Sequence, residues 1–157
     1  MFLDRYANLI QGLARDVTAL GSSPFYGYIW LLFLAVDPRV SLDLLLTFAL
    51  LMAISYAIKA LWFKPRPDHV EGVVHDNVLE QVDASSFPSA HSARAAAMAW
   101  IVIGAVEAGP ALASIVILGA LATGGSRVVL RRHSVGDVLG GFAIGVVAAV
   151  AVEILGP

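Results

Sequence analysis

The chain has 157 residues, of which 59% are hydrophobic and only 14% are charged, and its mean hydropathy is +0.81. A soluble protein of this length needs more polar residues to cover its surface, so the composition favours a single membrane-embedded domain over residues 1–157. The net charge of −2 excludes a nucleic-acid-binding module, and the absence of cysteine excludes disulfides, thiol nucleophiles and zinc–thiolate sites.

Residues 1–20 predict an amphipathic helix, because their apolar side chains recur at helical spacing with polar and charged side chains between them. The helix is expected to end near Gly21. We expect it to lie in the membrane interface, to pack on the rest of the protein as a surface helix, or to do both.

The remaining apolar stretches predict membrane-spanning helices, for which a bilayer core about 30 Å thick needs roughly 20 residues. The expected spans are 24–36, 42–63, 88–106, 110–125 and 134–155. Gly141 and Gly145 in the last span permit close contact with another helix. The predicted fold is therefore all-α: an integral membrane helical bundle of about five transmembrane helices plus an N-terminal amphipathic interfacial helix.

In this topology every lysine and arginine except Arg39 falls on one face of the membrane, together with all four histidines. The usual excess of basic residues on the inner face, with side chains that extend to the interface, explains Lys64, Arg131 and Arg132. It explains Lys59 poorly, because that residue lies a full turn before the polar loop 64–87. The chemistry of the protein is therefore expected on this face.

Three cations, Lys59, Arg66 and Arg127, are expected to meet there, at the ends of two spans and in the loop between them. Arginine presents a planar fork of donors that suits phosphate oxygens, and lysine adds a point charge. Ser89 lies at the start of a predicted helix, whose free backbone amides favour an anion. Since cations near hydrocarbon are costly without a partner, an anionic substrate group is the expected partner.

Two histidines and a carboxylate complete this set. His133 and Asp137 are four residues apart and would share one face of a helix, so Asp137 would fix the tautomer of the imidazole. The other imidazole nitrogen would then be free to attack phosphorus, with His91 as the general acid. These residues suffice for phosphoryl transfer without a metal or a cofactor. A single His-x3-Asp spacing is more often a local helix contact, so the prediction depends on all three segments together.

The three segments resemble the signature of the type 2 phosphatidic acid phosphatase superfamily, membrane lipid phosphate phosphatases that share a site with vanadium haloperoxidases. They are Lys59-x6-Arg66-Pro67, Pro88-Ser89-Ala90-His91 and Ser126-Arg127-x5-His133-x3-Asp137. The resemblance implies that His133 is the nucleophile, His91 the general acid and Asp137 the group that orients His133. It also implies that phosphate is bound by Lys59, Arg66, Ser89, the backbone amide of Ala90, and Arg127.

One position departs from the signature: Ala90 stands where the family usually has glycine. The backbone amide is retained, and alanine would be strained only if its φ were positive. The role of Arg94, one turn beyond His91, stays open between a second phosphate and an acidic loop residue. Three loop residues, Asp83, Ser85 and Ser86, are expected to cap the helix that follows them. His69 and His75 are interpreted as solvated loop residues rather than metal ligands.

The expected function is hydrolysis of a terminal phosphate from a lipid in the cell membrane, through a phosphohistidine. Candidate substrates are polyprenyl pyrophosphate, phosphatidic acid and phosphatidylglycerophosphate, with a slight preference for pyrophosphates because of the surplus basic residues. Two alternatives remain: a non-catalytic lipid-phosphate-binding module and a lipid phosphotransferase. The hydrophobic composition argues against a haloperoxidase.

Overall fold

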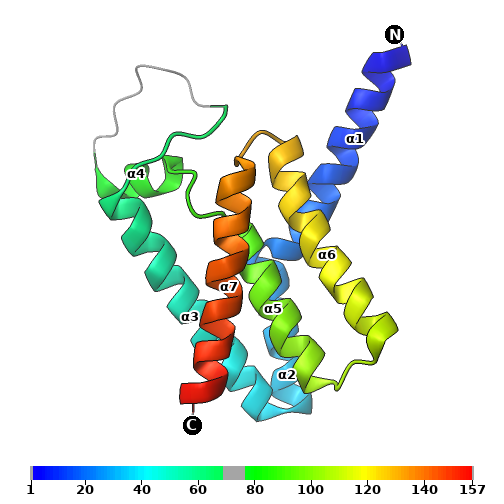
Figure 1. The fold of residues 1–157 in the computed structure, drawn as a ribbon, viewed down its shortest axis with the longest axis vertical. Coiled ribbons are helices and arrows are strands. Elements are labelled where there is room, and N and C mark those ends of the chain that lie inside the picture. The colour runs from blue at the N-terminus through cyan, green and yellow to red at the C-terminus, as the bar shows by residue number, and fades with distance from the viewer. Residues whose placement is uncertain (1, 69–76, 157) are drawn as a thin grey trace.

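The computed structural model describes residues 2–68 and 77–156, and the described residues form an all-α bundle (Figure 1). His69 and His75 lie outside them. The elements are α1 (Phe2–Thr18), the 3₁₀ turn η1 (Ala19–Gly21), α2 (Ser23–Val36), α3 (Pro38–Leu61), α4 (Val78–Ala84), α5 (Ala90–Ala105), α6 (Pro110–Val129) and α7 (Val135–Leu155). The prediction of an all-α membrane bundle is confirmed.

Among the described helices, three are long and apolar enough to cross a membrane, namely α3, α6 and α7. A fourth span is obtained if residues 6–21 and helix α2, which meet at an angle of 44°, are counted as one broken span. The expected number was about five. The difference arises because α2 and α5 have only 14 and 16 residues, which is short for a helix that crosses a bilayer alone.

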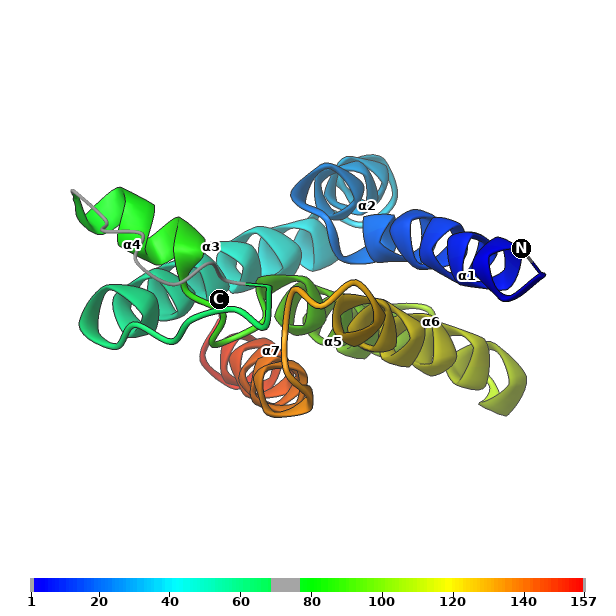
Figure 2. The ribbon, with the colours of Figure 1, turned by 90° about the horizontal axis from the view of Figure 1, so that it is seen from above.

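Helix α5 lies at the centre of the bundle and packs against α3, α6 and α7 (Figures 1 and 2). Its alanine-rich sequence keeps side chains small where other helices approach, and residues 92–97 are all buried. Helix α7 comes closest: a Cβ on Gly145 would lie 2.2 Å from the carbonyl oxygen of Ala93, and one on Gly141 would lie 2.5 Å from that of Ser89. The predicted close contact through these two glycines is confirmed.

Serine side chains start the two helices that carry the predicted histidine segments. The Ser89 hydroxyl accepts from the Ser92 amide at the beginning of α5. Ser134 and Asp137 form a capping box at the beginning of α7. The expectation that Asp83, Ser85 and Ser86 cap α5 is wrong: Asp83 lies within α4, Ser85 follows the end of α4, and Ser89 caps α5 instead.

Helix α1 packs against α6 and ends at the bend beside Gly21, close to the predicted end. Its large apolar side chains face away from the bundle: Leu9, Ile10 and Leu13 are 58%, 53% and 56% exposed. Ala14 on the opposite side is buried. A helix that presents leucine and isoleucine outward suits contact with lipid, and its placement in the membrane interface stays a prediction.

Candidate active site

The predicted site residues gather at one end of the bundle, where α3 and α6 end and α5 and α7 begin, at the top of Figure 1. His133 lies in the turn between α6 and α7 and is 4% exposed. Its backbone amide donates to the carbonyl oxygen of Arg127 at 3.2 Å. This hydrogen bond holds the histidine against the last turn of α6.

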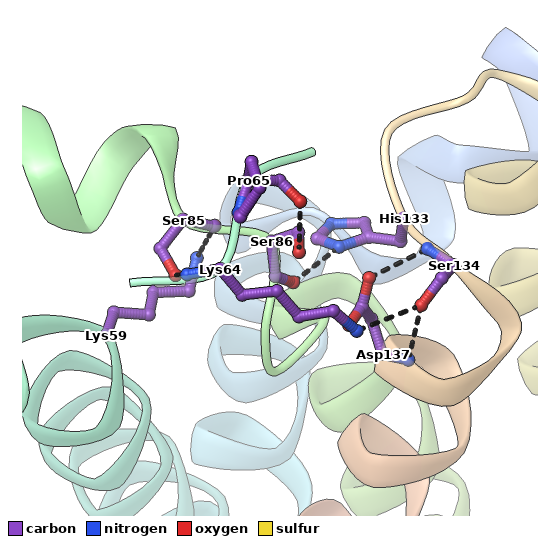
Figure 3. A network of polar contacts seen from close by, with 8 residues as sticks. All are labelled: Lys59, Lys64, Pro65, Ser85, Ser86, His133, Ser134 and Asp137. Atoms are coloured by element: carbon purple, nitrogen blue, oxygen red, sulfur yellow. Dashed lines mark hydrogen bonds and ion pairs between the residues drawn. The ribbon is translucent and has the colours of Figure 1, made fainter. Parts of the chain in front are cut away.

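The side chain of His133 is oriented by a backbone carbonyl (Figure 3). Its Nδ1 lies 2.7 Å from the carbonyl oxygen of Ser86. Because a carbonyl oxygen only accepts hydrogen bonds, Nδ1 must carry the proton in this contact. The neutral ring then has its lone pair on Nε2, for which the described residues supply no hydrogen bond. This is the tautomer that a nucleophilic imidazole requires.

Asp137 does not contact His133, its expected partner, but binds Lys64 and Ser134. Its Oδ1 accepts from Lys64 Nζ at 2.6 Å, and its Oδ2 accepts from the Ser134 amide at 2.7 Å (Figure 3). The predicted contact between Asp137 and His133 is wrong, because Ser134 caps α7 and leaves His133 outside the helix, where a four-residue spacing does not give a shared face. Asp137 instead ties the start of α7 to the loop after α3.

Lys64 therefore has a structural partner that the sequence interpretation missed. Besides Asp137, its Nζ donates to Ser134 Oγ at 3.2 Å and lies 5.9 Å from the centre of the Phe87 ring. Its carbonyl accepts from the Ser86 amide at 2.7 Å. Lys64 thus positions both the capping box of α7 and the residue that binds His133, and it does not simply extend to the interface.

The three predicted phosphate-binding cations are held by neutral oxygen atoms rather than by acids. Lys59 is buried, and its Nζ donates to the carbonyl oxygen of Ser85 at 3.0 Å. Arg66 donates to the carbonyl of Asp83, and Arg127 Nη1 donates to Thr18 Oγ1 at 3.0 Å. The Nε atoms of both arginines are buried without a hydrogen-bond partner among the described residues. An unpaired buried donor on a cation is costly, and an anion would remove that cost.

The charges around His133 act on its proton affinity. Burial, followed by the nearby charge of Arg127, lowers the pKa of His133 to about 4, although the hydrogen bond to Ser86 acts in the opposite direction. Arg66 and Lys59 lower it further. The pKa of the Arg66 guanidinium is also lowered, chiefly by burial and by the charge of Arg132. His133 is thus neutral at pH 7, as a nucleophile must be.

The second histidine segment lies beside the first. His91 is half-buried on the first turn of α5, within electrostatic range of His133 and Arg127. Ser89 is fully buried, and its amide donates to the carbonyl of Asp137 at 3.0 Å, which joins the starts of α5 and α7. Ala90 is the first helical residue of α5 and is not among the described non-glycine residues with positive φ. The alanine is therefore unstrained, and its amide remains at the open end of the helix.

Arg94 has a partner that neither sequence-based alternative included. It is 6% exposed, and its Nε donates to the carbonyl oxygen of Gly21 at 2.8 Å. Gly21 in turn packs on the backbone of His91, because a Cβ there would lie 2.6 Å from the His91 carbonyl oxygen. The bend between α1 and α2 thus supports the segment that carries His91.

No group of three or more His, Asp or Glu side chains placed to hold a metal ion occurs in residues 2–68 and 77–156. The contacts that build the site come from Lys64, Ser86 and Thr18 as well as from the predicted residues. Two of these, Ser86 and Thr18, carry no sequence signal, since one acts through its backbone and the other is an ordinary threonine near a helix end.

Comparison with known proteins agrees with this geometry. A family model described as the PAP2 superfamily matches residues 41–155. The chain belongs to the PAP2 superfamily. LpxE from Aquifex aeolicus has a similar fold, with a TM-score of 0.78 and 20% sequence identity over 93% of this chain and 86% of that one. A transmembrane PAP2-type phosphatidylglycerolphosphate phosphatase from Bacillus subtilis matches with a TM-score of 0.74 and 26% identity, over 94% and 76% of the two chains.

The match to the PAP2 superfamily covers all three predicted segments but begins after α1, η1 and α2. The protein is thus an integral membrane phosphatase of a family that acts on lipid-type substrates. Thr18 and Gly21, which contact Arg127 and Arg94, belong to the part outside the family model. This part of the chain therefore adds contacts of its own to the site.

Proposed function

We propose that this PAP2 protein hydrolyses the terminal phosphate of a lipid phosphate or pyrophosphate in the cell membrane, with His133 as the nucleophile. One observation carries the proposal. The Ser86 carbonyl fixes the Nδ1–H tautomer of His133 and leaves Nε2 free. Near it are two buried guanidinium Nε donors, on Arg66 and Arg127, that have no hydrogen-bond partner among the described residues. A phosphate placed there would satisfy the donors and meet the nucleophile at once.

In the first step, the lone pair of Nε2 on His133 attacks phosphorus, and the bond between phosphorus and the leaving oxygen breaks. In the free protein, burial and then the charge of Arg127 lower the pKa of His91 to about 3; the anionic substrate raises it, so that His91 is protonated in the complex and donates this proton to the leaving oxygen. The lipid then leaves as an alcohol or, from a pyrophosphate, as a lipid monophosphate. The proton on Nδ1 stays hydrogen-bonded to Ser86, which stabilises the ring as it becomes positively charged. Lys59, Arg66 and Arg127 balance the charge of the transferring phosphoryl group.

In the second step, water attacks the phosphohistidine. His91, now neutral, takes a proton from the water while the bond between Nε2 and phosphorus breaks. Inorganic phosphate leaves, and His133 returns to its neutral form. Ser89 and the amide of Ala90, at the start of α5, would help to hold the phosphoryl oxygens through both steps. No step of this sequence requires a metal ion.

An apolar groove supports a lipid as the substrate. It has a volume of about 500 Å³, lies between α5, α6 and α7, and is lined by residues such as Ala96, Leu121, Phe142 and Val146. Grooves lined by aliphatic side chains suit acyl or prenyl chains, and the cations lie at the end of the bundle where the same three helices meet the site. A lipid could then place its apolar tail in the groove and its phosphate headgroup at the cations.

The test is phosphate release by the purified protein in detergent across a panel of lipid phosphates, with His133→Gln as the control. We expect release from at least one lipid, loss in the variant, and no effect of a chelator. Binding without release would indicate a lipid-binding module. Transfer of the phosphoryl group to an added alcohol in place of water would indicate a phosphotransferase.

A further inference from the structure

A second polar cavity adjoins the candidate active site. It lies between α1 and the turn after α6 and has a volume of about 390 Å³, far more than the roughly 30 Å³ of one water molecule. Its polar lining consists of Gln11, Arg15, Thr18, Arg127, Arg131 and Arg132. Four of these six side chains are arginines, and none of the described residues that line the cavity is acidic. Its ligand should therefore be an anion.

Helix α1 builds one wall of this cavity with its polar face. Gln11, Arg15 and Thr18 are spaced by four and three residues, so they share one face of the helix. That face is turned toward α6, while Leu9 and Leu13 are exposed on the outside. Gln11 and Arg15 are exposed and Thr18 is half-buried, so a ligand can reach this wall of the cavity from water.

The other wall belongs to the turn that carries the nucleophile. The amides of Arg132 and His133 both donate to the carbonyl of Arg127, at 3.0 and 3.2 Å. Arg131, between them in the chain, has a φ of 55°, a left-handed conformation that is uncommon for a residue other than glycine. Non-glycine residues in this region are concentrated at ligand-binding sites. The cavity and His133 are thus fixed by the same turn.

The charges in the cavity are only partly balanced. Arg132 pairs with Asp68 at 3.2 Å. For Arg15 and Arg131 the described part of the chain contains no ion pair. Arg127 donates from one Nη atom to Thr18, and its buried Nε has no partner within residues 2–68 and 77–156. Arginines at a membrane surface that lack acidic partners favour phosphate, which their forked donors bind well.

We propose that this cavity binds a second phosphate of the substrate, the one that stays on the lipid while His133 attacks the terminal one. The inference rests on the proposed function and narrows its substrate class. Because Arg127 belongs to both the candidate active site and the cavity, the two phosphates must be adjacent. The substrate is therefore a lipid pyrophosphate rather than a lipid monophosphate.

The experiment compares a polyprenyl pyrophosphate with the monophosphate of the same prenyl chain. We expect the wild-type protein to prefer the pyrophosphate in kcat/KM by about tenfold or more, the value of one charge-assisted hydrogen bond. Arg15→Gln and Arg131→Gln should each lower this preference about five- to tenfold, mainly through KM. Arg39→Gln, at the opposite end of the bundle, should leave it unchanged. Equal losses on both lipids, or no loss, would overturn the proposal.

A binding measurement separates this proposal from the proposed function. In the His133→Gln protein, inorganic pyrophosphate should raise the Tm more than inorganic phosphate does, because it reaches both sites. The extra increase should disappear when Arg15→Gln is added. Equal increases with both anions, or an extra increase that survives Arg15→Gln, would reject the second site. Because this measurement detects binding only, it tests the second site even if the wild-type protein releases no phosphate.

Discussion

The two ends of the bundle use their polar side chains in different ways. At the end with His133, Lys59 is only 8% exposed and is held by a backbone carbonyl. At the opposite end, Asp37 accepts from the first amides of α3, and Glu153 accepts from Trp100 Nε1 at 2.9 Å near the surface. The polar groups at this end complete helix caps and surface contacts. The end with His133 buries Lys59 and holds two buried arginine Nε atoms for which the described part of the chain supplies no hydrogen bond.

This difference separates structural from functional polar residues. A carboxylate that caps a helix already accepts hydrogen bonds from backbone amides, so its position predicts nothing about a ligand. A guanidinium whose buried Nε has no hydrogen-bond partner among the described residues can gain one from a bound ligand. The contrast therefore predicts that equal substitutions at the two ends have unequal effects on activity.

The largest contrast is expected for the nucleophile. His133→Gln should lower the rate of phosphate release at least about 1,000-fold, because Gln cannot form the covalent intermediate. Arg39→Gln, exposed at the opposite end, should change the rate less than about twofold. Both rates are measured on the same lipid in detergent. Near-normal release by the His133 variant would contradict the account.

The next contrast concerns the forked donors of arginine. Arg127→Lys keeps the positive charge but loses the planar fork and the Nε donor, so kcat/KM should fall about 100-fold. The matched substitution Arg39→Lys should have no measurable effect. If Arg127→Lys were as active as the wild type, a positive charge alone would suffice at this position, and the Nε donor of Arg127 would not contribute to phosphate binding.

The close approach of α5 and α7 is the support that both ends share. Gly145→Ala places a Cβ 2.2 Å from the carbonyl of Ala93, so the helices must separate, at a cost of about 1–3 kcal/mol. Gly125→Ala on α6, where nothing lies within 4 Å, is the control. Thermal unfolding in detergent should show a lower Tm only for Gly145→Ala. An unchanged Tm would mean that this contact is looser than described.

The low pKa of His133 gives the site end a pH dependence. Because the pKa is about 4 when folded and about 6.5 when unfolded, the unfolded chain binds the proton first as the pH falls. The free energy of unfolding should therefore decrease between pH 6.5 and pH 4. His133→Gln removes this loss of stability. When the pH is lowered from 7 to 4.5, the Tm of the wild type should therefore fall by roughly 5 °C more than the Tm of the variant. Parallel pH profiles would contradict the buried neutral imidazole.

The smallest effect is expected in the groove. Val146→Trp fills part of the space between α5, α6 and α7, so the KM for a long-chain lipid phosphate should rise about three- to tenfold. A short water-soluble phosphate monoester, which has no tail to place, serves as the control substrate and should be unaffected. An equal effect on both substrates would show that the groove does not hold the tail.

Much of the fold and of the cation cluster follows from the sequence. Hydrophobic runs and breaks at Gly21, Pro38 and Pro110 place the helices, and the topology brings Arg66 and Arg127 to one end. The number of spans was harder to predict, because apolar residues line a helix buried in protein as well as one that faces lipid. Helix α5 is short and buried, and its Arg94 is held by another part of the chain.

The orientation of His133 was predicted incorrectly for a local reason. A four-residue spacing implies a shared face only if both residues are helical, and Ser134-x-x-Asp137 is itself the sequence pattern of a capping box. That pattern starts the helix after His133. The replacement contact, with the Ser86 carbonyl, depends on the path of a loop far away in the sequence. Side-chain identity does not encode such a backbone contact.

The proposed mechanism requires a covalent bond between phosphorus and His133, so the decisive experiment is to trap that intermediate. The protein is mixed with a lipid phosphate labelled in its terminal phosphoryl group and quenched in base, where a phosphohistidine survives. Mass spectrometry of the digested protein then locates the label. We expect phosphate on His133 and none in the His133→Gln protein. Phosphate on another residue, or turnover with no labelled protein at any time, would contradict it.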